Sequence, residues 1–290
     1  MKARPRIALV LLSAIGLGAC GGAGYGRPGQ APALPAMGRS SIDRQFVGYW
    51  DGWSKNNLAR TPGGVTEIPI AFGFLHGHTI TLEGGVDPGY VTAADIASLH
   101  ARGIKVTLSL GGSSPSNSFV FDGDVKGFEA SLSSVLAKLP LDGVDFDLEH
   151  GSTADRVKTL TTLITAARAY FDARGASGAI VTYPAWNLPS EYGDAAILKN
   201  AKVAAALSWV NVMAYENDNV AATERDVAAY GAIFDRAKIM MGVDIDDAPI
   251  PSVASLQRLS EWVSANGYGG MMAWTVNGIT ARQLDAITGR

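Results

Sequence analysis

Eight short apolar runs, separated by longer amphipathic stretches, follow one another along most of this chain. The runs are rich in β-branched and aromatic residues, as buried strands are, and they occupy 46–50, 68–75, 105–112, 143–149, 179–186, 209–216, 238–245 and 269–276. Segments with helical periodicity lie between them at 92–102, 125–139, 154–174, 222–236 and 252–266. Strands that alternate with helices form parallel sheets, and eight such units close into a barrel. We therefore expect an α/β fold, a single (β/α)8 TIM barrel.

Local signals support the helix boundaries. Thr92 followed by Asp95, and Ser252 followed by Ser255, resemble helix N-termini. Glycines that resemble helix ends are Gly103, Gly175 and Gly267. The alternative arrangement is an open doubly wound sheet, but the sequence GYWDG after the first strand lacks the dinucleotide-binding fingerprint. With 47% hydrophobic residues and a net charge of −3, the chain can build one large core and has no basic excess to attract nucleic acid.

The N-terminal residues lie outside this pattern. Basic residues at 2, 4 and 6 precede an apolar run at 7–19, which is shorter than the roughly 20 residues that a bilayer span needs. The only cysteine, Cys20, follows directly in LGAC, so residues 1–19 resemble a bacterial lipoprotein signal whose cysteine becomes acylated. A plain secretory signal is the alternative. Residues 20–44, rich in Gly, Pro and Ala, read as a flexible tether, and 45–290 as the folded domain.

This N-terminus also predicts where the protein resides. We expect an exported protein that lipidated Cys20 anchors to a membrane of a bacterial cell envelope, on the periplasmic side or at the cell surface. We expect the domain itself to be a monomer.

Three acids alternate with apolar residues in LDGVDFDLEHG, residues 141–151. Strand side chains alternate between faces, so Asp145, Asp147 and Glu149 point the same way, with successive acids roughly 6.6 Å apart. Two carboxylates at that separation repel by about 2.5 kcal/mol at a dielectric constant near 20, which is close to two pKa units. At least one of them should therefore hold a proton near neutral pH. Glu149, outermost at the end of the fourth strand, is the candidate general acid, and Asp147 would share or pass the proton towards buried Asp145.

Two further roles are compatible with these acids. A carboxylate cluster also suits Mg²⁺ or Ca²⁺, and a buried acid can pair with Lys or Arg for structural reasons alone. The sequence HGH at 76–78 raises a metal-dependent hydrolase, although only His100 and His150 remain as further ligands and His100 falls in a predicted helix. We expect His76 and His78 to be loop residues, and neither a metal nor a cofactor.

Aromatic residues gather at the predicted C-terminal ends of the strands. They are Tyr49, Trp50, Phe74, Tyr183, Trp186, Tyr215 and Trp274. Any one of them is more often part of a core, but several at one end of a barrel suit sugars, whose C–H faces stack on rings. Acids surrounded by aromatic walls therefore predict polysaccharide chemistry.

The motifs resemble those of glycoside hydrolase family 18, the chitinases and endo-β-N-acetylglucosaminidases. They are SLGG at 109–112, DGVDFDLE at 142–149, MAYE at 213–216 and the eighth-strand Trp274, in the family's order across nearly the whole domain. The DxDxE signature after a DG pair is the specific one. VGYW and DFDLEHG resemble the compact, hevamine-like members and their bacterial relatives.

The resemblance implies a mechanism in which the substrate supplies its own nucleophile. Glu149 would protonate the glycosidic oxygen while the 2-acetamido oxygen attacks the anomeric carbon, giving an oxazolinium intermediate and overall retention. Asp147 would stabilise the positive charge with support from Asp145, Tyr215 would bond the acetamido oxygen, and Trp274 would form the floor of the sugar site. Further expected substrate contacts are Gly111, Gly112, Met213 and Glu216.

The expected substrate is chitin or an N-acetylglucosamine oligosaccharide, and short loops favour endo-cleavage of accessible chains. An endo-β-N-acetylglucosaminidase acting on N-glycans and a noncatalytic carbohydrate-binding barrel are the alternatives. Glu216 stands where the family usually has Asp or Asn, and Tyr183-Pro184 also departs from the usual pattern. Both departures suggest a substrate other than plain chitin.

Overall fold

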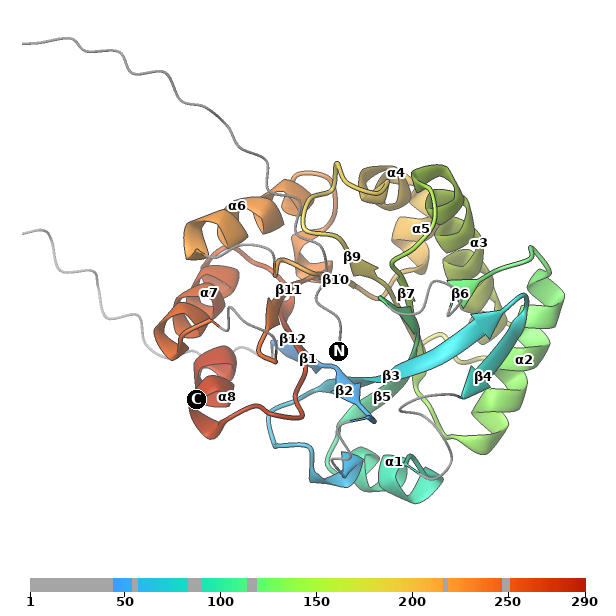
Figure 1. The fold of residues 1–290 in the computed structure, drawn as a ribbon, viewed down its shortest axis with the longest axis horizontal. Helices are drawn as coiled ribbons and strands as arrows, with labels where there is room; N and C mark the ends of the chain where they lie inside the picture. The colour runs from blue at the N-terminus through green and yellow to red at the C-terminus, as the bar shows by residue number, and fades with distance from the viewer. Residues whose placement is uncertain (1–43, 54–56, 83–89, 114–118, 216–218, 247–250) are drawn as a thin grey trace, which may run out of the picture. The chain divides into compact units, whose positions relative to one another are not determined.

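The chain forms one closed sheet surrounded by helices (Figure 1). The computed structural model describes residues 44–53, 57–82, 90–113, 119–215, 219–246 and 251–290. Hydrogen-bonded strands follow the order β8-β7-β5-β3-β1-β12-β11-β10-β9. The two strands that end this path, β8 (Ile180–Thr182) and β9 (Pro184–Ala185), belong to one extended stretch interrupted only at Tyr183. The sheet therefore returns to its starting strand, which confirms the predicted barrel.

The remaining strands have the following bounds: β1 (Gln45–Gly48), β2 (Trp50–Asp51), β3 (Glu67–His76), β4 (Thr79–Leu82), β5 (Lys105–Gly112), β6 (Phe119–Val120), β7 (Gly143–Leu148), β10 (Val210–Val212), β11 (Ile239–Asp244) and β12 (Gly270–Trp274). Neighbours along the barrel pair in parallel. The last residues of β3, from Gly73 to His76, pair antiparallel with β4, which lies off the barrel's strand path. Because β3 continues into that pair, His76 is the last residue of a strand, and our expectation of a loop residue was wrong there.

Helices form the outer ring in Figure 1. Their bounds are α1 (Ala93–His100), α2 (Val125–Lys138), α3 (Thr153–Asp172), α4 (Asp194–Lys199), α5 (Ala201–Ala206), α6 (Val220–Gly231), α7 (Val253–Ala265) and α8 (Ala281–Thr288), with short 3-10 turns at η1 (Leu58–Arg60) and η3 (Arg236–Lys238). The predicted caps are confirmed: Thr92 forms a capping box with Asp95, and the Ser252 hydroxyl accepts from the Ser255 N–H. Among the described residues, no helix is long and apolar enough to span a membrane.

Two apolar clusters lie on opposite faces of the barrel wall, a large one outside and a small one inside. Phe46 belongs to the large cluster that packs sheet against helices, whereas its neighbour Val47 belongs to a small one with Tyr49, Met240 and Met272. This division follows the alternation of side chains along β1. The buried polar residues carried by the strands include Glu67, Thr107, Ser109, Asp145, Thr182 and Asn211. The inside of this barrel is therefore partly polar, and the candidate site lies at the C-terminal ends of its strands.

Candidate active site

The acids predicted on the fourth strand lie on β7 and directly after it. Asp145 and Asp147 are buried, and Glu149, one residue beyond the strand end, is half-buried. Asp145 lies in register with Ser109 of β5 on one side and Thr182 of β8 on the other. The strand thus carries its acids from the buried interior towards the C-terminal end of the barrel, as alternation requires.

Asp145 is held by three hydroxyl groups, one from β5, one from β8 and one from Tyr49, directly after β1. Its carboxylate accepts from Ser109 Oγ at 2.6 Å, Thr182 Oγ1 at 2.6 Å and the Tyr49 hydroxyl at 2.9 Å. Asn211 Nδ2 in turn donates to the Tyr49 oxygen at 3.2 Å. Burial raises the pKa of Asp145 even though all three donors favour its charged form. The innermost acid is therefore rigidly placed, at a position where a negative charge is costly.

Tyr215 lies among the acids. Its hydroxyl donates to the sulfur of Met272 at 3.2 Å, and its ring is half-buried. Burial, together with the charges of Asp244, Asp147, Glu149 and Asp145 in that order, raises the pKa of Tyr215 well above its ordinary value. The phenol is consequently neutral at physiological pH and can act as a hydrogen-bond donor close to the carboxylates.

The two glycines of SLGG allow the strands to approach one another closely. Gly111 and Gly112 both have positive φ, at 113° and 88°. A Cβ on Gly111 would lie 2.2 Å from the carbonyl oxygen of Asp147, and one on Gly112 would lie 2.6 Å from the Phe72 ring. Only glycine fits these positions. Both were predicted as substrate contacts; the geometry shows that they make room for Asp147 and Phe72.

Aromatic rings form a continuous surface beside the acids. Trp274, at the end of β12, stacks on Phe72 with ring centroids 5.6 Å apart and an interplanar angle of 14°. Its ring is also 5.8 Å from Tyr49 and 6.0 Å from Trp53. Trp53 is 53% exposed and Tyr49 only 2%. The surface therefore runs from the barrel interior out to solvent.

Some predicted aromatics do not join this surface. Trp50 and Tyr183 are 2% and 0% exposed and pack in the large cluster outside the barrel, so they offer no face to a ligand. Phe74 contacts His76 edge-on at 6.0 Å. The reason is alternation: Trp50 follows inward-facing Tyr49 and so faces the other way.

The other predicted site residues have varied surroundings. Trp186 is half-buried and packs against the Tyr192 ring, with centroids 4.5 Å apart and an interplanar angle of 30°. Met213 packs against the cluster inside the barrel. Glu216 and Cys20 lie outside the described residues.

His78 binds Asp122 through Nδ1 at 2.8 Å, and the part of the chain that the structure describes holds no cluster of three or more His, Cys, Asp or Glu arranged to bind a metal ion.

The family model of glycosyl hydrolases family 18 matches residues 45–246, which span the acids, the glycines and Tyr215. The chain belongs to this family. As a family 18 protein it is a glycosidase, and its barrel is the fold that the alternation of strand-like runs and helical segments predicted.

Solved structures similar to this family 18 chain include several chitinases. A class V chitinase from Nicotiana tobaccum in complex with NAG4 has a TM-score of 0.69 and 16% identity, covering 85% of this chain and 98% of its own. A mutant chitinase from Cycas revoluta in complex with (GlcNAc)4 has a TM-score of 0.68 and 14% identity, and the match covers 84% of this chain and 99% of that one. A chitinase from Bacteroides thetaiotaomicron has a TM-score of 0.65 and 14% identity, and the match covers 84% of this chain and 95% of that one. No curated protein sequence matched the chain.

Sequence reasoning missed three residues of this site: Phe72, Trp53 and Asp244. The register of β3 against β5 shifts between Ala71 and Gly73, so the alternation that puts Ile68 and Ile70 in the outer cluster does not predict that the Phe72 ring faces Trp274. Trp53 lies just beyond the short strand β2, and its proximity to Trp274 depends on the pairing of β1 with β12. Asp244 ends β11, in register with Trp274. The available signal was its position as the last strand-like residue before a turn.

Proposed function

We propose that this family 18 glycosidase hydrolyses β-1,4-linked N-acetylglucosamine in chitin or chitooligosaccharides, with retention of anomeric configuration. The observation that carries the proposal is the convergence of Asp145, Asp147 and Glu149 with the neutral phenol of Tyr215, beside the aromatic surface of Trp274. The solved complexes of two similar chitinases with chitotetraose support this choice of substrate.

In the first step, Glu149 donates its proton to the glycosidic oxygen as the bond from that oxygen to the anomeric carbon breaks. The acetamido oxygen of the same sugar forms the new bond to the anomeric carbon, which yields an oxazolinium ion and releases the reducing-end fragment. Glu149 then takes a proton from water, whose oxygen attacks the anomeric carbon and reopens the ring. The acid regains its proton, and the substrate's own acetamide replaces an enzyme nucleophile.

The remaining residues stabilise this charge. Asp147 balances the cationic oxazolinium, and Asp145 keeps the strand end in place through its three hydroxyl partners. When substrate binds, the Tyr215 hydroxyl exchanges its bond to the Met272 sulfur for one donated to the acetamido oxygen, as that oxygen becomes the nucleophile. The stacked rings of Trp274 and Phe72 supply the apolar floor on which the sugar's C–H face packs, and exposed Trp53 extends that floor to a further sugar.

The test is release of reducing sugar from chitotetraose by the wild type and by Glu149→Gln. We expect the variant to lose about a hundredfold or more in turnover, because the amide cannot donate the acid's proton. Proton NMR of the first products should show the β anomer before mutarotation. Equal rates for wild type and variant, or an α anomer as first product, would reject the mechanism. A high-mannose glycoprotein assayed in parallel reports whether N-glycans are the better substrate.

We also propose that Cys20 is acylated and anchors the enzyme to an envelope membrane, on the basis of LGAC after the apolar run at 7–19. Expressed in a bacterium with a lipoprotein pathway, the wild type should fractionate with membranes and incorporate labelled palmitate. Cys20→Ser should incorporate none. A wild type found only in the soluble fraction would exclude the anchor.

A further inference from the structure

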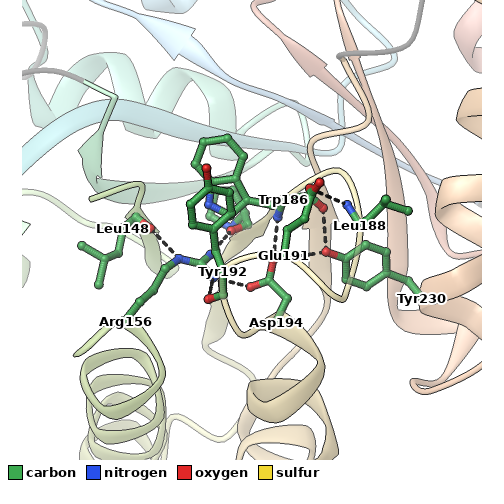
Figure 2. Close-up of polar contacts among 9 residues, drawn as sticks. Leu148, Arg156, Trp186, Leu188, Glu191, Tyr192, Asp194 and Tyr230 are labelled. Atoms are coloured by element: carbon green, nitrogen blue, oxygen red, sulfur yellow. Dashed lines mark hydrogen bonds and ion pairs between the residues drawn. The ribbon is translucent and has the colours of Figure 1, made fainter. Parts of the chain in front are cut away.

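A buried arginine lies directly behind the proposed catalytic acid. Arg156, in the first turn of α3, is 2% exposed, and Figure 2 shows it reaching from the helix towards the end of β7. Its Nε donates to the carbonyl oxygen of Leu148 at 2.8 Å, and Nη1 donates to that of Tyr192 at 3.0 Å. Nη1 also forms a buried ion pair with Asp194. Leu148 directly precedes Glu149, so one guanidinium holds the backbone from which the acid projects.

The partner carboxylate holds the neighbouring wall of the site. Asp194 is fully buried, and its second oxygen accepts the Trp186 backbone N–H at 2.7 Å. The Tyr230 hydroxyl contacts that oxygen at 3.1 Å and the Trp186 carbonyl at 2.6 Å (Figure 2). Both backbone polar groups of Trp186 are therefore bound by this network. Trp186 follows β9 at the same end of the barrel as Glu149.

The segment between Trp186 and Asp194 presents an exposed ring. Tyr192 is 47% exposed, and its ring packs at a tilt against that of Trp186. Its φ of 47° is uncommon for a residue with a side chain, and Arg156 binds its carbonyl. The ion pair thus joins three things: the strand end at Glu149, the backbone of Trp186 and the turn that carries Tyr192.

A purely stabilising role accounts poorly for this pair. Burying two charges costs solvation that an apolar pair of similar size would not lose, and burial raises the pKa of Asp194 in spite of the guanidinium beside it. A planar guanidinium offers several donors in fixed directions, which an apolar side chain or a lysine cannot do. The feature that requires arginine is the simultaneous orientation of a carboxylate and three carbonyls, those of Leu148, Tyr192 and, through Nη2 at 3.5 Å, Pro184 of β9.

We propose that Arg156 and Asp194 are positioning residues, which keep Glu149 aimed at the glycosidic oxygen and hold the Trp186–Tyr192 pair as a sugar-stacking wall beside it. The inference rests on the proposed function. Arg156 touches neither substrate nor reacting atoms, and it acts through the carbonyl next to the acid.

Leaving-group dependence separates positioning from stability. Chitotetraose needs a protonated leaving group, whereas the dinitrophenyl glycoside of N,N′-diacetylchitobiose releases a stable anion and hardly needs the acid. Arg156→Lys keeps the positive charge beside Asp194 but cannot bind the carboxylate and all three carbonyls. We expect its kcat/KM on chitotetraose to fall about tenfold or more and on the dinitrophenyl glycoside about twofold or less. Glu149→Gln should show the same asymmetry more strongly.

Arg168 supplies the matched control on the same helix. It binds the carbonyls of Ala179 and Ala206, which precede β8 and β10 at the opposite end of the barrel. Arg168→Lys should lower the melting temperature without changing the ratio of the two activities. If Arg156→Lys lowers both activities equally, or behaves as Arg168→Lys does, the positioning role is wrong.

Tyr230→Phe tests whether the network holds the Trp186–Tyr192 wall. The variant keeps the charges of Arg156 and Asp194, so the proposal stays testable if Arg156→Lys does not fold. The variant loses the hydroxyl bond to the Trp186 carbonyl. We expect KM for chitotetraose to rise about threefold to tenfold with a smaller change in kcat, because sugar stacking and not the acid is disturbed. An unchanged KM would overturn the wall's role. A wild type that cleaves neither substrate would instead reject the proposed function, and the positioning role with it.

Discussion

At the scale of single residues, this site combines one rigidly held acid with a neutral phenol. Asp145 accepts hydroxyl bonds from β5, β8 and the end of β1, so its position is set by three strands at once. Tyr215 has its pKa raised by burial and by the neighbouring carboxylates, which ensures that its proton is present for donation. Each residue depends on charges and donors that come from elsewhere in the sequence.

Tyr215→Phe should lower turnover far more than it weakens binding. The hydroxyl bond strengthens only as the acetamido oxygen attacks, and removing one such donor costs about a hundredfold in kcat. Steady-state kinetics on chitotetraose measure kcat and KM separately. A change confined to KM would show that the phenol binds the substrate without assisting the attack.

At the scale of secondary-structure elements, the site depends on how closely β5 approaches β7. The six paired positions from Thr107 to Gly112 bring the SLGG backbone alongside the acids, and Gly111 lies against the Asp147 carbonyl. Close approach of two backbones is a property of the pair of strands, because neither strand requires glycine when considered alone.

Gly111→Ala should therefore destabilise the barrel by about 2 kcal/mol or more and reduce activity. The added Cβ would lie 2.2 Å from the carbonyl of Asp147, at a φ of 113° that alanine rarely adopts. Urea unfolding followed by tryptophan fluorescence measures the loss. Gly178→Ala is the control, since a Cβ there meets nothing within 4 Å. Equal stability of the two variants would contradict this account of the SLGG motif.

At the scale of the whole molecule, closing eight strand positions into a barrel traps ionisable groups that the chemistry does not use. Glu67, at the start of β3, is 1% exposed and accepts from Thr107 Oγ1 at 2.8 Å. Burial raises the pKa of Glu67 well above its ordinary value, and nearby Asp145 and Asp142 act in the same direction. The folded protein consequently holds a proton there that the unfolded chain has released above about pH 4.3.

Stability should therefore fall as pH rises from the ordinary pKa of Glu67, about 4.3, to its raised value in the folded protein, and Glu67→Gln should remove this component. Below about pH 4 the variant and the wild type should differ little, because both folded and unfolded Glu67 are then protonated. The melting temperature of Glu67→Gln should exceed that of the wild type by an amount that grows as pH rises above about 5 and becomes constant once the raised pKa of Glu67 is passed. The melting temperatures are measured by circular dichroism. If those of the variant and the wild type differ by the same amount at every pH in this range, the pKa of Glu67 does not change on folding.

The features that could be predicted from the sequence are periodic and local. The alternation of apolar runs and amphipathic segments predicted the barrel, DGVDFDLE predicted the strand that carries Asp145 and Asp147, and Thr92 and Ser252 predicted helix starts, all because neighbours in the chain govern these features. The tertiary structure alone decided which aromatics meet. Phe72 and Trp53 contact Trp274 because β3 and β12 flank β1 and a register shift turns the β3 side chains, while Trp50 and Tyr183 point into the core. Contacts between strands distant in sequence leave no period for a single chain to display, and the Arg156–Asp194 pair, 38 residues apart, was invisible for the same reason.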